Sequence, residues 1–201
     1  MKANCNKNCH LELVVNNLAE RLSPVLFGCK PAMLLGLHCW DKLQSCPIYF
    51  KYQQEIHDLF DIEAVVFSQT ETMTQIYFYR QDLLQEALND SEAECILNEA
   101  GYKSNCVEYA VKELKKRFST RQCPHELGLF VGYPPKDVSG YIAGDQPVEN
   151  IKGPWRVYGN PEPSLKLMKR HSVAKRAMKL LIQKNKSFHR CMRKLYRQQP
   201  A

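Results

Sequence analysis

The sequence predicts an α+β protein: a small sheet of about four strands packed with helices, plus a long basic C-terminal helix. Short runs of β-branched and aromatic residues are typical of strands, and longer segments with apolar residues every three or four positions are typical of helices. Of the 201 residues, 44% are hydrophobic, which suits a globular domain and excludes a disordered chain. Every apolar run is far shorter than the roughly 18 residues that span a bilayer, so no transmembrane segment is expected.

Apolar spacing and turn residues place the boundaries of the expected elements. Helices are expected at residues 11–22, 53–60, 81–100, 106–118 and 135–142. Strands are expected at residues 63–69, 74–80, 126–133 and 155–158, and residues 26–35 form a loop or a short strand. Pro24 is expected to end the first helix, because proline disrupts helical hydrogen bonding. The residues between the first two strands suit a hairpin.

The formal net charge of +7 is concentrated at the C-terminal end of the chain. Twelve of the 28 Lys and Arg residues follow Glu162, the last acidic residue, so the first 162 residues hold sixteen basic and 21 acidic side chains and a net charge of −5. Residues 164–199 contain neither Gly nor Pro, which favours one helix roughly 50 Å long. Its apolar-leaning stripe repeats every seven residues at Leu167, Ala174, Leu181, Phe188 and Leu195, with His171, Met178, Asn185 and Met192 four places after the first four of these.

This charge asymmetry divides the chain into an α+β domain, residues 1–160, and a basic amphipathic helix, residues 161–201. A segment of this kind either packs on the body with its cations in solvent or binds a polyanion: RNA, an anionic membrane face or an acidic protein surface. The residues expected to contact nucleic acid are Lys169, Arg170, Lys175, Arg176, Lys179, Arg190, Arg193 and Lys194.

The nine cysteines lead to the first functional hypothesis, a metal- or redox-cofactor-binding protein that uses Cys and His. An odd number of cysteines without an export signal favours reduced thiols, so we expect a cytoplasmic protein. Thiolates and imidazoles are ligands for zinc and iron–sulfur clusters, and a Cys-Pro thiolate is an axial ligand for haem. The candidate ligands are Cys5, Cys9, His10, Cys39, Cys46, Cys123 and His125. Because no Cys-x-x-Cys pair is present, the alternative is that these cysteines are scattered small hydrophobic residues.

The dipeptide His125-Glu126 leads to a further hypothesis, an enzyme in which His125 is the general base for a cysteine nucleophile. Adjacent residues on a strand point to opposite faces, so the two side chains need not meet. No established catalytic motif accompanies them. The alternative is that both residues pair structurally near the start of a strand.

Three segments carry a resemblance to a known family. The long block PHELGLFVGYPPKDVSGYI, with PWRVYGN after it, resembles a bacterial family known as domain of unknown function 3793. The segment GCKPAMLL and the strand IYFYR are also similar to that family. The resemblance extends over roughly residues 11–178 and implies a single cytoplasmic domain. It implies no activity and assigns no catalytic residue.

Overall fold

The structure, a computed structural model, describes residues 3–120, 123–188 and 190. Its centre is an antiparallel sheet of β1 (Ala32–His38), β2 (Glu63–Gln69) and β3 (Met73–Tyr79) in the order β1-β3-β2. Strands β2 and β3 form the expected hairpin, with a register shift near Phe67. The described part of the chain thus has three strands where the sequence predicts about four.

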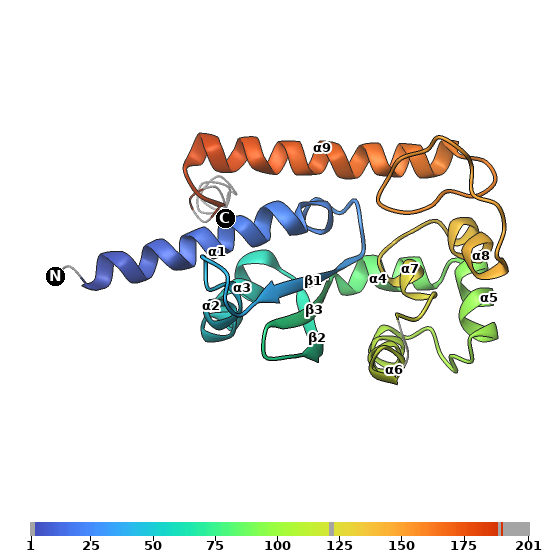
Figure 1. The fold of residues 1–201 in the computed structure, drawn as a ribbon, viewed down its shortest axis with the longest axis horizontal. Helices are drawn as coiled ribbons and strands as arrows, with labels where there is room; N and C mark the ends of the chain where they lie inside the picture. The colour runs from blue at the N-terminus through green and yellow to red at the C-terminus, as the bar shows by residue number, and fades with distance from the viewer. Residues whose placement is uncertain (1–2, 121–122, 189, 191–201) are drawn as a thin grey trace, which may run out of the picture.

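Nine helices surround the sheet in the described residues (Figure 1). They are α1 (Ala3–Leu26), α2 (Ser45–Lys51), α3 (Gln53–Phe60), α4 (Gln81–Leu88), α5 (Ser91–Glu99), α6 (Val107–Thr120), α7 (Leu127–Phe130), α8 (Pro135–Ala143) and α9 (Glu162–Asn185). The expected helix at 81–100 is two helices, because Asp90 caps α5 by accepting hydrogen bonds from the amides of Glu92 and Ala93. None of the described helices is both long and apolar enough to cross a membrane.

The two faces of the sheet support two separate hydrophobic clusters. On β3, Ile76 and Phe78 point into a cluster shared with α1, α2, α3 and α9, whereas Tyr77 and Tyr79 point into a cluster shared with α4 to α8. This follows from the alternation of side chains along a strand. All four side chains are buried, because β3 is the central strand and is covered on both faces.

Two predicted strands are wrong. Residues 126–133 contain the short helix α7, and residues 155–158 are irregular. A short buried apolar run does not distinguish a strand from a helix by periodicity alone. The decisive residue is Gly132, which has a φ of 76° and ends α7 with two hydrogen bonds, from the Gly132 amide to the Leu129 carbonyl (2.9 Å) and from the Tyr133 amide to the Gly128 carbonyl (2.8 Å).

The first helix also differs from the prediction, because α1 continues past Pro24 to Leu26. It ends in the same way as α7: Gly28 has a φ of 66°, and the Gly28 and Cys29 amides donate to the carbonyls of Val25 and Pro24. This turn directs the chain from α1 to Lys30 and the start of β1.

Helix α9 lies alongside α1 (Figure 1) and ends at Asn185, well before the predicted end at residue 199. Lys186, with a φ of 63°, follows the last helical residue. The buried residues of α9 are Ser164, His171, Ala174, Met178 and Ile182. His171, Ala174 and Met178 belong to the predicted stripe, so the sequence correctly identified much of the packed face.

Candidate functional site

The segments that carry the family resemblance converge on one pocket of about 680 Å³. Its walls come from residues 30–34, 123–141 and 154–158, and every lining residue except Cys123 falls within the three segments GCKPAMLL, PHELGLFVGYPPKDVSGYI and PWRVYGN. The volume is in the range of small-molecule sites, roughly 300–1,000 Å³. This pocket is therefore the candidate functional site.

Lys30 is a buried charged residue in the pocket wall, and it is unpaired within the part of the chain that the structure describes. The residue is only 9% exposed, and among the described residues no carboxylate pairs with it and no hydrogen bond is made by its side chain. Its Nζ lies 5.5 Å from the centroid of the Tyr133 ring. Burial lowers the pKa of Lys30 to about 8, and the charge of Lys175 on α9 contributes to the same shift.

An aromatic stack stands beside Lys30. The rings of Tyr133 and Trp155 are stacked with their centroids 4.5 Å apart and an interplanar angle of 22°. His171 is next to Trp155, with ring centroids 6.1 Å apart. Its Nε2 donates to the Cys29 carbonyl at 3.2 Å. Burial, together with the charge of Lys30, lowers the pKa of His171 to about 4, so this imidazole is neutral near pH 7.

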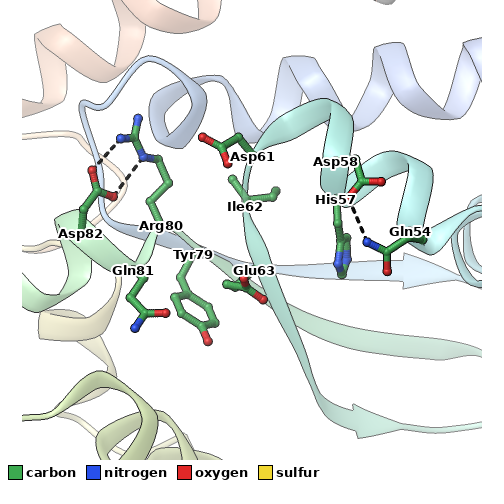
Figure 2. A pocket seen from close by; sticks show the side chains of 10 residues that line it. All are labelled: Gln54, His57, Asp58, Asp61, Ile62, Glu63, Tyr79, Arg80, Gln81 and Asp82. Atoms are coloured by element: carbon green, nitrogen blue, oxygen red, sulfur yellow. Dashed lines mark hydrogen bonds and ion pairs between the residues drawn. The ribbon is translucent and has the colours of Figure 1, made fainter.

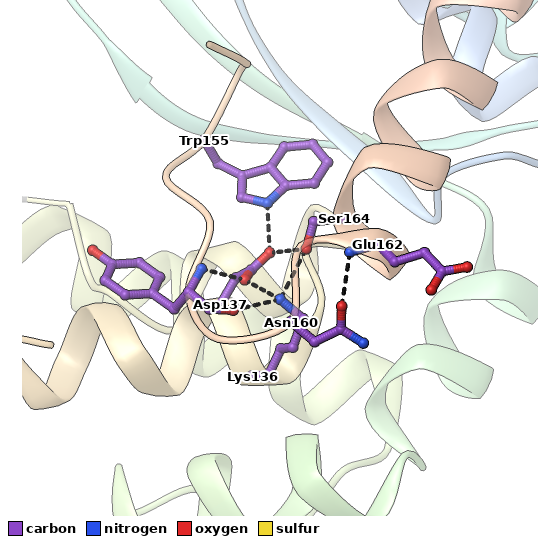
Figure 3. Close-up of polar contacts among 7 residues, drawn as sticks. Lys136, Asp137, Trp155, Asn160, Glu162 and Ser164 are labelled. Atoms are coloured by element: carbon purple, nitrogen blue, oxygen red, sulfur yellow. Dashed lines mark hydrogen bonds and ion pairs between the residues drawn. The ribbon is translucent and has the colours of Figure 1, made fainter. Parts of the chain in front are cut away.

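Asp137 fixes the position of Trp155, one of the two rings of this stack (Figure 3). Its carboxylate accepts hydrogen bonds from Trp155 Nε1 (2.8 Å), Ser164 Oγ (2.6 Å), the Tyr158 amide (2.9 Å) and Lys136 Nζ. Burial alone would raise the pKa of Asp137, but these donors outweigh burial and hold its pKa below the usual value. The network joins α8, the loop before α9 and the first turn of α9.

Lys136 differs from Lys30 because acceptors surround its ammonium. In addition to Asp137, Lys136 Nζ donates to the Tyr158 carbonyl (2.7 Å) and to Ser164 Oγ (3.0 Å). The close approach of Tyr158 to α8 requires a glycine, because a Cβ at Gly140 would lie 2.7 Å from Tyr158 Cβ. Residues from two of the family-like segments, PHELGLFVGYPPKDVSGYI and PWRVYGN, therefore belong to one buried network.

His125 and Glu126 point in different directions, as the sequence allowed. Glu126 is buried. It accepts a hydrogen bond from Tyr102 Oη at 3.3 Å and forms an ion pair with Arg117 Nη1 at 3.5 Å. His125 is exposed and packs edge-on against Tyr141, with ring centroids 5.0 Å apart. Glu126 thus anchors α7 to the second cluster, while His125 lines the pocket.

A second pocket, of about 440 Å³, lies near His57 and Arg80 (Figure 2). Two pairs of its polar side chains contact each other: Arg80 forms an ion pair with Asp82 at 2.6 Å, and Gln54 Nε2 donates to Asp58 at 2.9 Å. His57 Nε2 and Tyr49 Oη are 2.8 Å apart. The charged residues that line this pocket are exposed or half-buried, whereas Lys30 in the larger pocket is buried.

The predicted metal ligands do not come together among the described side chains. No group of three or more His, Cys, Asp or Glu in that part of the chain is arranged to hold a metal ion. The reason is their placement: His10 is on α1, Cys39 and Cys46 flank the loop from β1 to α2, and Cys123 and His125 line the pocket. The side chains of Cys5 and Cys9 lie outside the described part of the structure.

Two of these cysteines do meet as a pair. The interaction with the Cys46 thiol, together with burial, raises the pKa of Cys39. Cys46 is buried, and its Sγ is 3.4 Å from Thr74 Oγ1. Burial and the charge of Glu126 raise the pKa of Cys123, which disfavours a thiolate nucleophile beside His125.

The predicted nucleic-acid-binding residues are described only in part. Those on α9, namely Lys169, Arg170, Lys175, Arg176 and Lys179, are exposed, as is Arg190. Arg193 and Lys194 lie outside the described residues. Sequence reasoning missed Lys30, although the Gly28 turn and the following Pro31 indicated an unusual chain path at this position.

The comparisons with known proteins agree with the resemblance. Neither the curated proteins nor the solved structures contain a match to this chain. A family described as protein of unknown function (DUF3793) matches residues 18–192, which include α9 as well as the pocket. The match extends over most of the 201 residues, and the chain therefore belongs to this family.

Proposed function

We propose that this protein binds a small aromatic anion in the pocket beside Lys30. The observation that carries the proposal is the buried Lys30 ammonium, which has no carboxylate partner among the described residues. Burying an unpaired charge is unfavourable, and protein interiors normally pair such groups. A ligand carboxylate or phosphate at this position supplies the missing partner.

The charges around Lys30 favour an anion over a cation or a neutral molecule. Lys175 adds positive charge close to Lys30, and Arg156 lines the same pocket. The carboxylate of Asp137 also faces this region, but four hydrogen-bond donors already satisfy it. The potential at Lys30 is therefore positive, which attracts anions.

The Tyr133–Trp155 stack favours a ligand with a planar ring. Stacked rings present a flat apolar face, and the hydrogen bond from Trp155 to Asp137 fixes its orientation before any ligand arrives. A wall that is already ordered loses little conformational freedom on binding. An aromatic ring against this wall and an anion at Lys30 use both features together.

Fluorescence of Trp155 tests the proposal. The chain has two tryptophans, and Trp40 is 83% exposed, so Trp40→Phe leaves Trp155 as the single reporter. We expect phenyl phosphate and benzoate to quench it saturably and benzyl alcohol to bind at least tenfold more weakly. Because small ligands gain only about 0.3–1.5 kcal/mol per heavy atom, titrations should extend to several millimolar.

The matched variants are Lys30→Met and Lys152→Met. Lys30→Met keeps the length of the side chain and removes its charge, so we expect anion affinity to fall by tenfold or more, about 1.4 kcal/mol. Lys152 is an exposed lysine near the pocket that does not line it, and its substitution should leave affinity within twofold. Equal affinity for the anions and benzyl alcohol, or no effect of Lys30→Met, contradicts the proposal.

The cations of α9 support a second candidate function, RNA binding. Within the described residues, no ion pair involves an α9 cation, and the exposed set is Lys166, Lys169, Arg170, Lys175, Arg176, Lys179 and Lys184. Removing α9 is unsuitable as a test, because Ala174, Met178 and Ile182 are part of the buried face. Replacing the exposed Lys166, Lys169 and Lys179 by Gln leaves that face intact.

RNA binding through α9 should make the RNA affinity depend strongly on salt concentration. We expect the wild-type protein to bind a single-stranded RNA with an affinity that falls steeply as salt increases, and the triple Gln variant to bind more weakly with a shallower slope. A triple variant with Glu108, Glu113 and Glu149 changed to Gln, which raises the net charge, should not weaken binding. An RNA affinity that is unchanged by the α9 substitutions excludes α9 as the binding surface.

A further inference from the structure

We propose that the ligand of this pocket is an aromatic carbonyl compound carrying an anion, and that the Lys30 amine condenses with its carbonyl carbon to form a reversible imine. This inference rests on the proposed binding of an aromatic anion in the same pocket. It adds a chemical role for Lys30 beyond charge pairing.

The geometry around Lys30 leaves its amine available for reaction. Lys30 lines the pocket, and its Nζ lies 5.5 Å from the centroid of the Tyr133 ring and has no hydrogen-bond acceptor among the described residues. Lys136, which lies nearby, shows the opposite arrangement, because its ammonium donates to three oxygen acceptors. Of these two lysines, only Lys30 has an unoccupied nitrogen next to a space that a ligand fits.

The protonation state of Lys30 also suits a nucleophile. Only the neutral amine attacks a carbonyl, and an ordinary lysine is almost entirely protonated near neutral pH. Burial and the charge of Lys175 lower the pKa of Lys30 to about 8. At pH 7.4 this gives on the order of a hundredfold more neutral amine than an exposed lysine has.

The reaction balances without an oxidant or a reductant. The nitrogen lone pair attacks the carbonyl carbon, and the carbonyl π electrons move to oxygen, which takes up a proton to give a carbinolamine. The carbinolamine then loses water as the C=N bond forms. Both hydrogens of the neutral amine leave in that water, and hydrolysis reverses every step.

The aromatic wall and the cations direct the ligand. Tyr133 and Trp155 line the same pocket as Lys30, so a ring packed against this stack keeps its substituents in the space that Lys30 lines. The charges of Lys175 and Arg156 favour a ligand that carries a carboxylate or a phosphate. After imine formation Lys30 has a substituted nitrogen, so an anion elsewhere on the ligand retains these cations as partners.

Reductive trapping with 4-formylbenzoate tests the inference on the full-length protein. Incubation at pH 7.4 with cyanoborohydride should give one predominant adduct, and peptide mass mapping should locate it at Lys30. The initial rate of adduct formation at Lys30 should rise with pH and have its midpoint near pH 8. The corresponding rise for exposed lysines should have its midpoint above pH 10. An excess of 4-(hydroxymethyl)benzoate, which has the anion but no carbonyl, should slow trapping at Lys30 alone.

Two variants separate this inference from the proposed function. Lys30→Arg keeps the positive charge but has no reactive amine, so it should still bind 4-(hydroxymethyl)benzoate while its adduct is lost. Lys152→Arg should leave the adduct yield unchanged. Binding of 4-(hydroxymethyl)benzoate without predominant trapping at Lys30 overturns the imine and leaves anion binding in place, and absence of any binding overturns both. An adduct spread evenly over the lysines also overturns the imine.

Discussion

Asp137 and Lys30 are two buried charged residues in the same pocket, and they differ in whether other protein groups pair with their charge. The Asp137 side chain is 1% exposed and accepts hydrogen bonds from four donors, one of which is an ammonium. Lys30 is 9% exposed and has no such partner among the described residues. The charge of Asp137 therefore holds the fold together, and the charge of Lys30 is left for a ligand.

The largest effect is expected from breaking the Asp137 network. Asp137→Ala leaves Lys136 without its carboxylate and removes the acceptor of Trp155, Ser164 and the Tyr158 amide. Removing one partner of a buried charge pair is strongly destabilising, so we expect the free energy of unfolding to fall by about 3–5 kcal/mol. Urea denaturation measures it.

The control for Asp137 is Asp145→Ala, in the exposed loop that follows α8. Its effect should be within about 0.5 kcal/mol, as for surface positions in general. A loss below about 1 kcal/mol for Asp137→Ala would show that the network is not structural, and the contrast with Lys30 would then disappear.

Lys30→Met should have the opposite sign. The folded-state pKa of Lys30 is about 8, below the ordinary value of 10.5, so below pH 8 the folded protein holds an unfavourable buried charge. Replacing it by an apolar side chain of similar length should raise the free energy of unfolding by roughly 1–3 kcal/mol at pH 7. Urea denaturation at pH 7 and pH 10.5 should show the gain at the lower pH only.

That result would also distinguish a functional lysine from a structural one. A gain in stability together with a loss of anion binding is the pattern expected for a site in which function is kept at the expense of stability. Lys152→Met should change neither quantity. Destabilisation by Lys30→Met at pH 7 would indicate instead that the ammonium supports the fold.

His171 adds an effect of pH to the same comparison. The groups that face it are the cations Lys30, Lys175 and Arg170 and the Cys29 carbonyl, and together with burial the cations keep its pKa near 4, below the usual 6.5. The unfolded chain therefore binds a proton more readily, and stability is full above pH 6.5 and falls as the pH decreases toward 4. We expect a loss of about 1–2 kcal/mol between pH 7 and pH 5.

His171→Gln provides the control for this effect. Glutamine still donates to the Cys29 carbonyl but does not titrate, so its urea midpoint should depend less on pH than that of the wild type over the same window. Identical pH dependence of the two proteins would assign the effect to other groups. The comparison requires no ligand.

The sequence contained the local signals but not the contacts between distant segments. The stripe through His171, Ala174 and Met178 predicted which face of α9 packs, and the hairpin of β2 and β3 was visible in its β-branched and aromatic runs. Residues 126–133 were misassigned because a buried apolar run fits either a strand or a helix. Gly132, as a helix-ending residue, was the signal that would have corrected it.

The candidate site was harder to predict, because burial of Lys30 depends on residues far away in the sequence. Tyr133 and Lys175 lie about a hundred residues or more after it. Gly28 and Pro31 indicate an unusual chain path near Lys30, but they do not indicate that its side chain is buried. The cysteines were conspicuous in number, but the six whose side chains the structure describes are spread over several helices and loops. A count of residues thus pointed to metal chemistry, and the fold points to an unpaired ammonium.

Trp155 belongs to both sides of the comparison, and the smallest predicted effect separates its two roles. Its indole nitrogen donates to Asp137, and its ring stacks on Tyr133 beside Lys30. Trp155→Phe removes the hydrogen bond and keeps a ring, so we expect a loss of about 1 kcal/mol in unfolding free energy. Trp155→Ala removes both, and calorimetric titration with phenyl phosphate should then show at least tenfold weaker binding. If Trp155→Phe weakens phenyl phosphate binding as much as Trp155→Ala does, the orientation set by Asp137 matters more to the ligand than the aromatic face itself.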